Sequence, residues 1–141
     1  MIFVFEGTDK SGKTSLINKI NEETNYTYWI LDRSFISSIV YTKLFKRDNL
    51  DIWYKRAKEL LRKNEFMFIL CKCNSNIIKE RLMKCNETLS NELLNIDYVY
   101  EVFKNTLDEL KCNYIIVNTE EDINKLTKEL INIIEANEVS I

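Results

Sequence analysis

The chain contains two glycines, five residues apart, and a lysine and a threonine follow the second of them. These residues belong to the segment Gly7-Thr8-Asp9-Lys10-Ser11-Gly12-Lys13-Thr14. The spacing matches a Walker A motif, a phosphate-binding loop (P-loop) in which backbone N–H groups surround a phosphate chain and glycines allow an approach that a Cβ would block. In such a loop Lys13 bridges the terminal phosphates and the Thr14 hydroxyl is a ligand of Mg²⁺. The segment therefore predicts a site for a nucleoside triphosphate.

A second group of charged residues, Asp32-Arg33, follows a run rich in β-branched and aromatic residues. Ligands of an open parallel sheet bind at the carboxyl ends of its strands. If this strand lies beside the strand before the loop, the Asp32 carboxylate reaches the water shell of the metal and Arg33 points toward the phosphoryl group in transfer. The simpler interpretation is that Asp32 caps the next helix and Arg33 is a solvated surface charge. Capping and metal contact are compatible, and we prefer the catalytic interpretation.

Histidine is absent from the chain. This excludes a Ser-His-Asp triad, a Cys-His pair and any imidazole ligand for a metal. An acid or a base would have to be a carboxylate, Lys, Tyr or Cys. The cysteines do not form a paired CxxC framework, so we expect reduced, mostly buried thiols. They are Cys71, Cys73, Cys85 and Cys112.

Length and composition favour one compact domain, residues 1–141, because 45% of the 141 residues are apolar. The formal net charge of −2 disfavours a nucleic acid polymer as a partner. The sequence has no run of about 18 apolar residues, the length that spans a bilayer, and its first residues do not resemble a signal peptide. We therefore expect a soluble, cytoplasmic protein without a membrane partner.

The hydrophobic pattern predicts strands that alternate with helices. Strands are expected over residues 1–6, 26–31, 66–71 and 114–117, and helical spacing is found over 15–20, 35–44, 52–61, 74–84, 93–110 and 123–134. Such an alternation implies a parallel sheet with right-handed crossovers. The predicted fold class is therefore α/β, a three-layer sandwich of the P-loop NTPase type around a small, mainly four-stranded parallel sheet.

Three segments resemble the thymidylate kinase family. Phe5–Thr14 is similar to the P-loop of that family, which often reads FEGxDxxGK followed by Ser or Thr. Asp32–Tyr41 is similar to the family's DRYxxSSxAYQ segment. Phe68–Leu82 has a weaker similarity to the strand, polar turn and Glu-Arg helix that come before the lid.

The resemblance implies roles for residues around the loop. Asp9 would face the sugar hydroxyl of the acceptor, Arg33 the acceptor phosphate, and Lys10 the terminal phosphate of the donor. In the family a basic residue in the loop accompanies a lid that is poor in arginine, and the expected lid, residues 86–91, has no basic residue. Arg81, just before this lid, would clamp phosphates or stack on adenine, or it would be an ordinary exposed helix charge.

The predicted site has three overlapping sets of residues. The catalytic set is Lys10, Lys13, Asp32 and Arg33. The metal ligands are Thr14 and Asp32, with Mg²⁺ as the metal and ATP as the phosphoryl donor. The nucleotide-binding set is Gly7, Thr8, Asp9, Lys10, Ser11, Gly12, Lys13, Thr14, Ser15 and Arg81.

The chain departs from the family between the helix after the loop and Asp32. Family members have a second strand and an Arg-Glu-Pro segment there that holds the acceptor, whereas here Asp32 follows Asn25 almost at once. Ser34 replaces the usual aromatic residue, and Asp-Arg-Ser is similar to a segment of deoxynucleoside kinases. Residues 43–63 carry eight basic and three acidic side chains, which would replace the missing acceptor arginines or form a solvated helix face. Nearby aromatic side chains would stack on a base or pack in the core: Tyr41, Trp53 and Tyr54.

The residues and the resemblance together predict an enzyme of nucleotide biosynthesis that moves the γ-phosphate of ATP to a deoxynucleoside monophosphate, with thymidylate as first choice. Such an acceptor arrives with an ionised phosphate, so positioning and charge neutralisation suffice without a histidine base. Two alternatives stay open, a deoxynucleoside kinase and a nucleotide-binding P-loop protein that has lost turnover. A GTPase is disfavoured because the Asn-Lys-x-Asp signature is absent. The expected partners are ATP and a small nucleotide or nucleoside acceptor, and a homodimer stays open.

Overall fold

Four parallel strands form one sheet in the computed structural model, which describes residues 1–138. The strands are β1 (Ile2–Gly7), β2 (Ile30–Asp32), β3 (Phe66–Lys72) and β4 (Tyr114–Asn118). Their order across the sheet is β2-β1-β3-β4, and every neighbouring pair is parallel. The carboxyl ends of the strands therefore meet at one edge of the sheet, where ligands bind in open α/β folds. The predicted four-stranded parallel sheet is confirmed.

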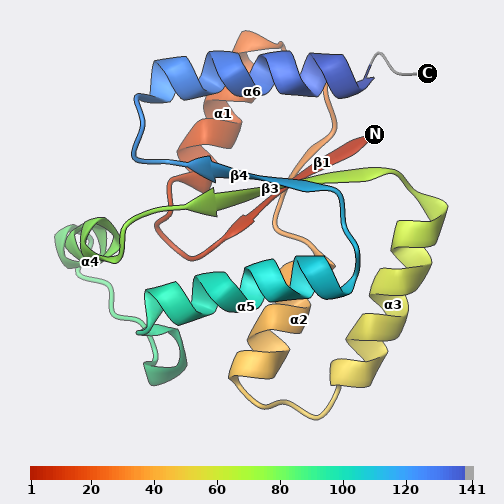
Figure 1. Ribbon diagram of the computed structural model, residues 1–141. Coiled ribbons are helices and arrows are strands. Elements are labelled where there is room, and N and C mark those ends of the chain that lie inside the picture. The colour runs from red at the N-terminus through yellow and green to blue at the C-terminus, as the bar shows by residue number, and fades with distance from the viewer. Residues whose placement is uncertain (139–141) are drawn as a thin grey trace.

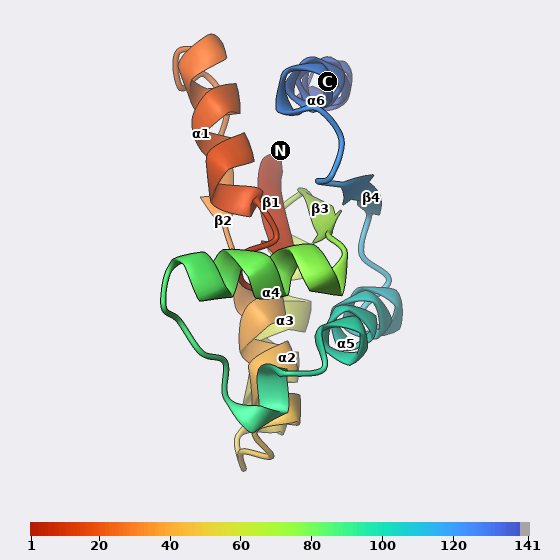
Figure 2. The same ribbon diagram turned by 90° about the vertical axis from the view of Figure 1, so that its left-hand side faces the viewer.

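Helices cover both faces of the sheet (Figure 1). On one face lie α1 (Lys13–Glu23) and α6 (Ile123–Glu138), and on the other lie α2 (Phe35–Leu44), α3 (Leu50–Lys63) and α5 (Ile96–Glu109). The helix α4 (Ser75–Lys84) lies beyond the carboxyl ends of β3 and β4, and the short 3-10 helix η1 (Asn91–Leu93) connects it to α5 (Figure 2). The predicted three-layer arrangement is therefore present.

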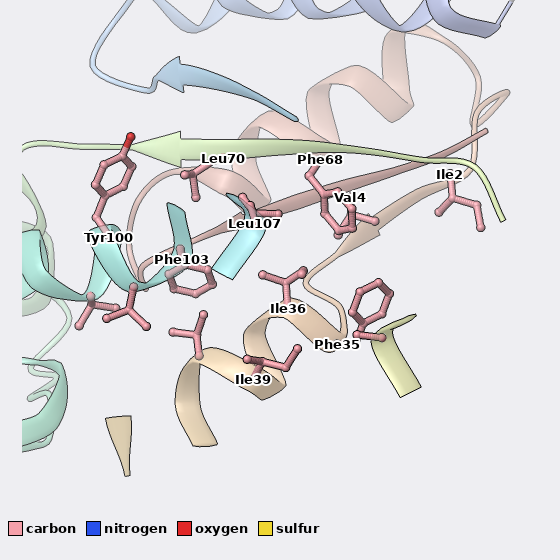
Figure 3. Packing of buried hydrophobic residues seen from close by; sticks show 14 residues of the cluster. Ile2, Val4, Phe35, Ile36, Ile39, Phe68, Leu70, Tyr100, Phe103 and Leu107 are labelled. Carbon is pink, nitrogen blue, oxygen red and sulfur yellow. The ribbon is translucent and has the colours of Figure 1, made fainter. Parts of the chain in front are cut away.

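The alternation of side chains along β1 divides the interior into two cores. Ile2 and Val4 belong to the core beneath α2 and α5, whereas Phe3 and Phe5 belong to the core beneath α1 and α6. Figure 3 shows the first of these cores, where side chains of the sheet face those of α2 and α5. Because successive side chains of a strand point to opposite faces, Glu6 continues the row of Ile2 and Val4 toward α2.

The second strand is shorter than the sequence pattern predicts. Strand structure was expected over residues 26–31, but β2 covers Ile30–Asp32, which pair with Phe3–Phe5 of β1. The residues before it form a turn, because Asn25 and Tyr26 have positive φ angles of 52° and 55° and the Tyr26 N–H donates to the Asn21 carbonyl. The aromatic character of residues 26–29 therefore does not create a strand, and the one backbone bond from this stretch to β1 is the Trp29 carbonyl accepting from the Phe3 N–H at 2.9 Å.

Two further expectations need correction. The helix expected over residues 93–110 begins at Ile96, and Leu93 lies in η1. The cysteines are all free, as expected, but only Cys71 and Cys73 are buried, whereas Cys112 is half-buried and Cys85 is exposed. The expectation of mostly buried thiols is therefore wrong for Cys85. No helix within residues 1–138 has the length and apolar character to cross a membrane.

Candidate active site

The phosphate-binding loop has the backbone geometry that its glycines predict. Gly7 ends β1 with a φ of 146°, and a Cβ at this position would lie 2.7 Å from the Cys71 carbonyl oxygen. Gly12 precedes α1 with a φ of 91° and gives that helix no side-chain cap. The first N–H groups of a helix have no intrahelical acceptor, and with the positive end of the helix dipole they form an anion site. The start of α1 is thus open to a phosphate.

A cavity of about 1040 Å³ lies in front of this loop. Its wall includes Asp9 to Leu16, Asp32, Arg33 and Arg81, so the predicted nucleotide-binding residues line it with the exception of Gly7 and Thr8. Ile77 of α4 and residues 119–121 after β4 also line it, and Thr119 lies close to Gly12. Sequence reasoning missed these last residues, although the carboxyl end of a fourth parallel strand is a signal that could have found them.

The structure brings Lys13, Thr14 and Asp32 together. Asp32 is the last residue of β2 and pairs in register with Phe5 of the neighbouring β1. The Thr14 hydroxyl donates to Asp32 Oδ2 at 3.0 Å, and Lys13 Nζ lies 3.8 Å from Asp32 Oδ1. Burial and the nearby Arg33 lower the pKa of Lys13. The capping interpretation of Asp32 is wrong, because Ser34 caps α2 by accepting a hydrogen bond from the Ile36 N–H.

The Thr14 hydroxyl and the Asp32 carboxylate suit Mg²⁺. Both are hard oxygen donors, and Mg²⁺ typically binds through one or two carboxylates together with substrate phosphates and water. Among residues 1–138 no cluster of three or more His, Cys, Asp or Glu side chains could hold a metal. The hydroxyl and the carboxylate therefore fit a Mg²⁺ ion that is also bound by phosphates and water.

Arg33 is fixed from several sides at the start of α2. Its φ is 70°, a left-handed conformation that is uncommon outside glycine, and its backbone N–H donates to the Phe5 carbonyl at 2.9 Å. Nη2 donates to Asp9 Oδ1 at 2.6 Å and Nη1 to Ser37 Oγ at 3.0 Å. The guanidinium also lies 5.4 Å from the ring centroid of Tyr41. Arg33 is therefore not a freely solvated surface charge.

The structure places Lys10 and Arg81 together on the lid side of the loop. Lys10 Nζ forms an ion pair with Glu87 of the connector at 3.1 Å, and this partner raises the pKa of Lys10. Arg81 Nη1 donates to the Lys10 carbonyl at 2.6 Å and to Cys73 Sγ at 3.7 Å. Arg81 thus helps to hold the backbone of the loop in place, and it also lines the cavity.

A second cavity, of about 400 Å³, lies on the other side of Arg33. It is lined by hydroxyl, aromatic and cationic side chains: Arg33, Ser34, Ser37, Ser38, Tyr41, Thr42, Arg47 and Trp53. The Arg47 backbone is held after α2 because its N–H donates to the Thr42 carbonyl at 3.0 Å and Lys46 has a φ of 53°. Arg33 therefore borders both cavities.

The basic segment 43–63 contributes less to this cavity than its charge suggested. Of its eight basic residues, Arg47 lines the cavity beside Arg33. Lys43 instead pairs with Glu109 of α5 at 3.3 Å, and the Tyr54 hydroxyl donates to the same carboxylate. Trp53 and Tyr41 line the cavity, but Tyr54 faces α5. Of the basic segment and the aromatic residues expected near an acceptor, Arg47, Tyr41 and Trp53 line this cavity.

Comparisons with known proteins agree with this architecture. The model of the thymidylate kinase family matches residues 22–130, and a search of the curated proteins found no match. The YorR protein of Bacillus subtilis, solved in complex with phosphorylated GDP, superposes with a TM-score of 0.70 at 17% identity over 98% of each chain. Deoxyadenosine kinase from M. mycoides with bound dCTP gives a TM-score of 0.65 at 13% identity, over 96% of this chain and 100% of that one. At these identities the solved structures establish the fold alone, which is the predicted α/β fold.

Proposed function

Since the chain belongs to the thymidylate kinase family, a family of nucleotide kinases, we propose that it transfers the γ-phosphate of ATP to a deoxynucleoside monophosphate, with thymidylate as the first candidate. One observation carries the proposal. Arg33 lines both the cavity in front of the P-loop and the second cavity. A cation at the junction of donor and acceptor is placed to stabilise charge on a phosphoryl group as it moves between them.

The donor would occupy the larger cavity. The N–H groups at the start of α1 and the buried Lys13 ammonium would hold its phosphates, because both present positive charge to the same point. Arg81 donates to the Lys10 carbonyl and so helps to hold the loop backbone, with its N–H groups, in place before the nucleotide arrives. The wall formed by Ile77 and residues 119–121 leaves room for the nucleoside.

The metal would be Mg²⁺, held by Thr14 and Asp32. A bound Mg²⁺ would neutralise charge on the donor phosphates, which lowers the barrier to phosphoryl transfer. The chain's own contribution is to hold the hydroxyl and the carboxylate 3.0 Å apart at the ends of adjacent elements. Lys13 Nζ, which lies 3.8 Å from the same carboxylate, helps to orient it.

The acceptor would occupy the second cavity, with its phosphate toward Arg33. Arg47, which also lines this cavity, would supply its second cation. Tyr41 and Trp53 supply aromatic surface for a base. Because the family's Arg-Glu-Pro segment has no counterpart here, we propose looser selection among bases than in a full-length member.

The state of the carboxylates near the loop favours a monophosphate over a nucleoside as acceptor. A nucleoside kinase must remove a proton from a sugar hydroxyl, which requires a carboxylate that is free to accept it. Asp9 is paired with Arg33 at 2.6 Å, Asp32 accepts from Thr14, and Glu6 is fully buried. A deoxynucleoside kinase nevertheless stays the second candidate, because Asp32-Arg33-Ser34 is similar to that class and deoxyadenosine kinase shares the fold.

The proposal is tested by incubating the purified chain with ATP, Mg²⁺ and, one at a time, the deoxynucleosides and their monophosphates, with product masses measured. We expect ADP together with a deoxynucleoside diphosphate. Formation of monophosphates from nucleosides would favour the second candidate. Nucleotide binding by calorimetry without ADP formation from any acceptor would identify a nucleotide-binding protein without turnover. The Lys13→Ala variant serves as the control for contaminating kinases.

A further inference from the structure

Glu6 is a fully buried carboxylate that the proposed reaction does not use. It lies at the carboxyl end of β1, one residue before the P-loop glycine, and has an exposed fraction of 0%. Two serine hydroxyls donate to it, Ser34 Oγ to Oε1 at 2.8 Å and Ser37 Oγ to Oε2. Both serines belong to the start of α2, beside Arg33. The carboxylate therefore connects the P-loop strand to the Asp-Arg turn.

The contacts of the two serine hydroxyls determine which atoms donate and which accept. Ser34 Oγ accepts from the Ile36 N–H at 3.2 Å, so its own proton is available for Glu6. Ser37 Oγ accepts from Arg33 Nη1 at 3.0 Å and donates to Glu6. A hydroxyl has a single proton to donate, so these contacts form a chain from the Arg33 guanidinium through Ser37 to the buried carboxylate.

The other end of the guanidinium is held by a different carboxylate. Arg33 Nη2 donates to Asp9 Oδ1 at 2.6 Å at the rim of the site, where the Asp9 side chain is 48% exposed. The guanidinium group of arginine is planar, so two contacts on different nitrogens fix its plane as well as its position. Asp9 would be disturbed by any ligand entering the cavity that it lines. The contact through Ser37 is more buried, because Ser37 is 5% exposed, although it too lines the second cavity.

Burying Glu6 has an electrostatic cost. Desolvation raises the pKa of Glu6 to about 7, although the bonds from Ser37 and Ser34 and the charge of Arg33 act in the opposite direction. Burial raises the pKa of Tyr41 on α2 and of Cys71 on β3, and the charge of Glu6 acts in the same direction. Buried carboxylates are rarely retained for stability alone, since apolar residues of similar volume fill such positions at lower cost.

We propose that Glu6, acting through Ser37, is a positioning residue that orients the Arg33 guanidinium toward the junction of the two cavities. The inference rests on the proposed function for its kinetic consequence, but the orientation itself is a property of the chain without substrate. Glu6 is not among the residues that line either cavity. Its effect reaches the reaction only through the direction in which Arg33 presents its N–H groups.

The kinetic test uses Ser37→Ala, Ser37→Thr and Glu6→Gln, with product formation followed at varied acceptor and at varied ATP. Ser37→Ala and Glu6→Gln should lower kcat/KM for the acceptor by about 10- to 100-fold, while the KM for ATP changes less than about twofold. Ser37→Thr keeps the hydroxyl and should retain most of the activity. The matched control is Thr127→Val, which removes a buried hydroxyl of α6 that donates to the Ile123 carbonyl far from Arg33.

A double-mutant cycle separates positioning from a general loss of structure. If Ser37 acts through Arg33, Ser37→Ala should have little further effect in an Arg33→Ala background, because the group that it positions is gone. Additive losses would overturn the proposal. Equal losses for ATP and acceptor, or an equal loss in Thr127→Val, would overturn it as well.

A second measurement does not depend on activity. The Arg33 side chain, assigned by comparison with Arg33→Ala, should give a distinct Nε–Hε signal in NMR spectra of the wild-type chain without nucleotide. Ser37→Ala should shift this signal toward that of a solvated arginine, and Ser37→Thr should preserve it. An unchanged signal in Ser37→Ala refutes the positioning role. A shifted signal in a chain that phosphorylates no acceptor would uphold the positioning and refute the proposed function.

Discussion

The two sides of Arg33 are built in different ways. The phosphate cradle of the proposed donor side comes from one continuous segment, in which the loop and the first turn of α1 present backbone N–H groups and Lys13 to the cavity, and Asp32, Arg81 and residues 119–121 complete the wall. The proposed acceptor side comes from the β2–α2 junction, one face of α2, the turn after it and Trp53 of α3. A phosphate-binding loop is therefore specified by local sequence, whereas the acceptor cavity depends on how separate helices pack.

Lys13→Ala should have the largest effect on activity, and it acts on the proposed donor side. The variant removes the buried ammonium inside the phosphate cradle, so kcat/KM for ATP should fall by about 10³-fold or more. Acceptor binding, measured by calorimetry with thymidylate, should change little because Lys13 does not line the second cavity. Lys19→Ala on the same helix is the matched control. Normal turnover by Lys13→Ala would refute the P-loop assignment.

Arg33→Ala tests the role of the residue that lines both cavities. We expect a higher acceptor KM together with a lower kcat, and a combined loss in kcat/KM of about 10²- to 10³-fold, because the cation acts on the phosphate in both the ground state and the transition state. Arg33→Lys keeps the charge but loses the planar fork and should recover only part of the activity. A change confined to thermal stability would show that Arg33 has a structural role only.

Asp32→Asn should have a smaller effect, and the effect should depend on the metal. The carboxylate orients a hydrated cation and does not contact the nucleoside, so ATP binding should be largely intact while turnover falls by about 10- to 100-fold. A Mg²⁺ titration of the rate should show a higher half-saturating concentration in the variant. Identical Mg²⁺ dependence in the two proteins would contradict the assignment of Asp32 as a metal ligand.

The smallest expected effect concerns stability as a function of pH. The folded pKa of Glu6, about 7, lies above the ordinary value of 4.5, so between these values the folded chain holds a proton that the unfolded chain has released. Stability should therefore fall as pH rises from about 4.5 to 7 and then level off. As pH rises over this range, the free energy of unfolding of Glu6→Gln should increase by about 1 to 3 kcal/mol relative to that of the wild type. Urea denaturation of both proteins at pH 5 and pH 8 measures the difference, and an equal difference at the two pH values would refute the raised pKa.

The sequence predicted the donor side in detail and the acceptor side only in part. Gly7, Lys13 and Thr14 lie within one segment of eight residues, so their spacing alone indicated the cradle and its flanking elements. Asp32 could be placed because a strand end beside the loop has few alternatives in a parallel sheet. Glu6 was not identified as a partner of Ser37, because only the packing of α2 against β1 brings the two together. For the same reason, net charge could not reveal that Lys43 turns toward α5 while Arg47 lines the cavity.

The ratio of kcat/KM for thymidylate to that for thymidine tests the central claim most directly. A site built around Arg33 and Arg47 leaves these cations without a partner when the acceptor has no phosphate, and such sites reject the uncharged analogue strongly. With saturating ATP and Mg²⁺, we predict that thymidylate exceeds thymidine by about 10⁴-fold or more. Phosphorylation of thymidine with equal or better efficiency would contradict the account and would identify the second cavity as a nucleoside site.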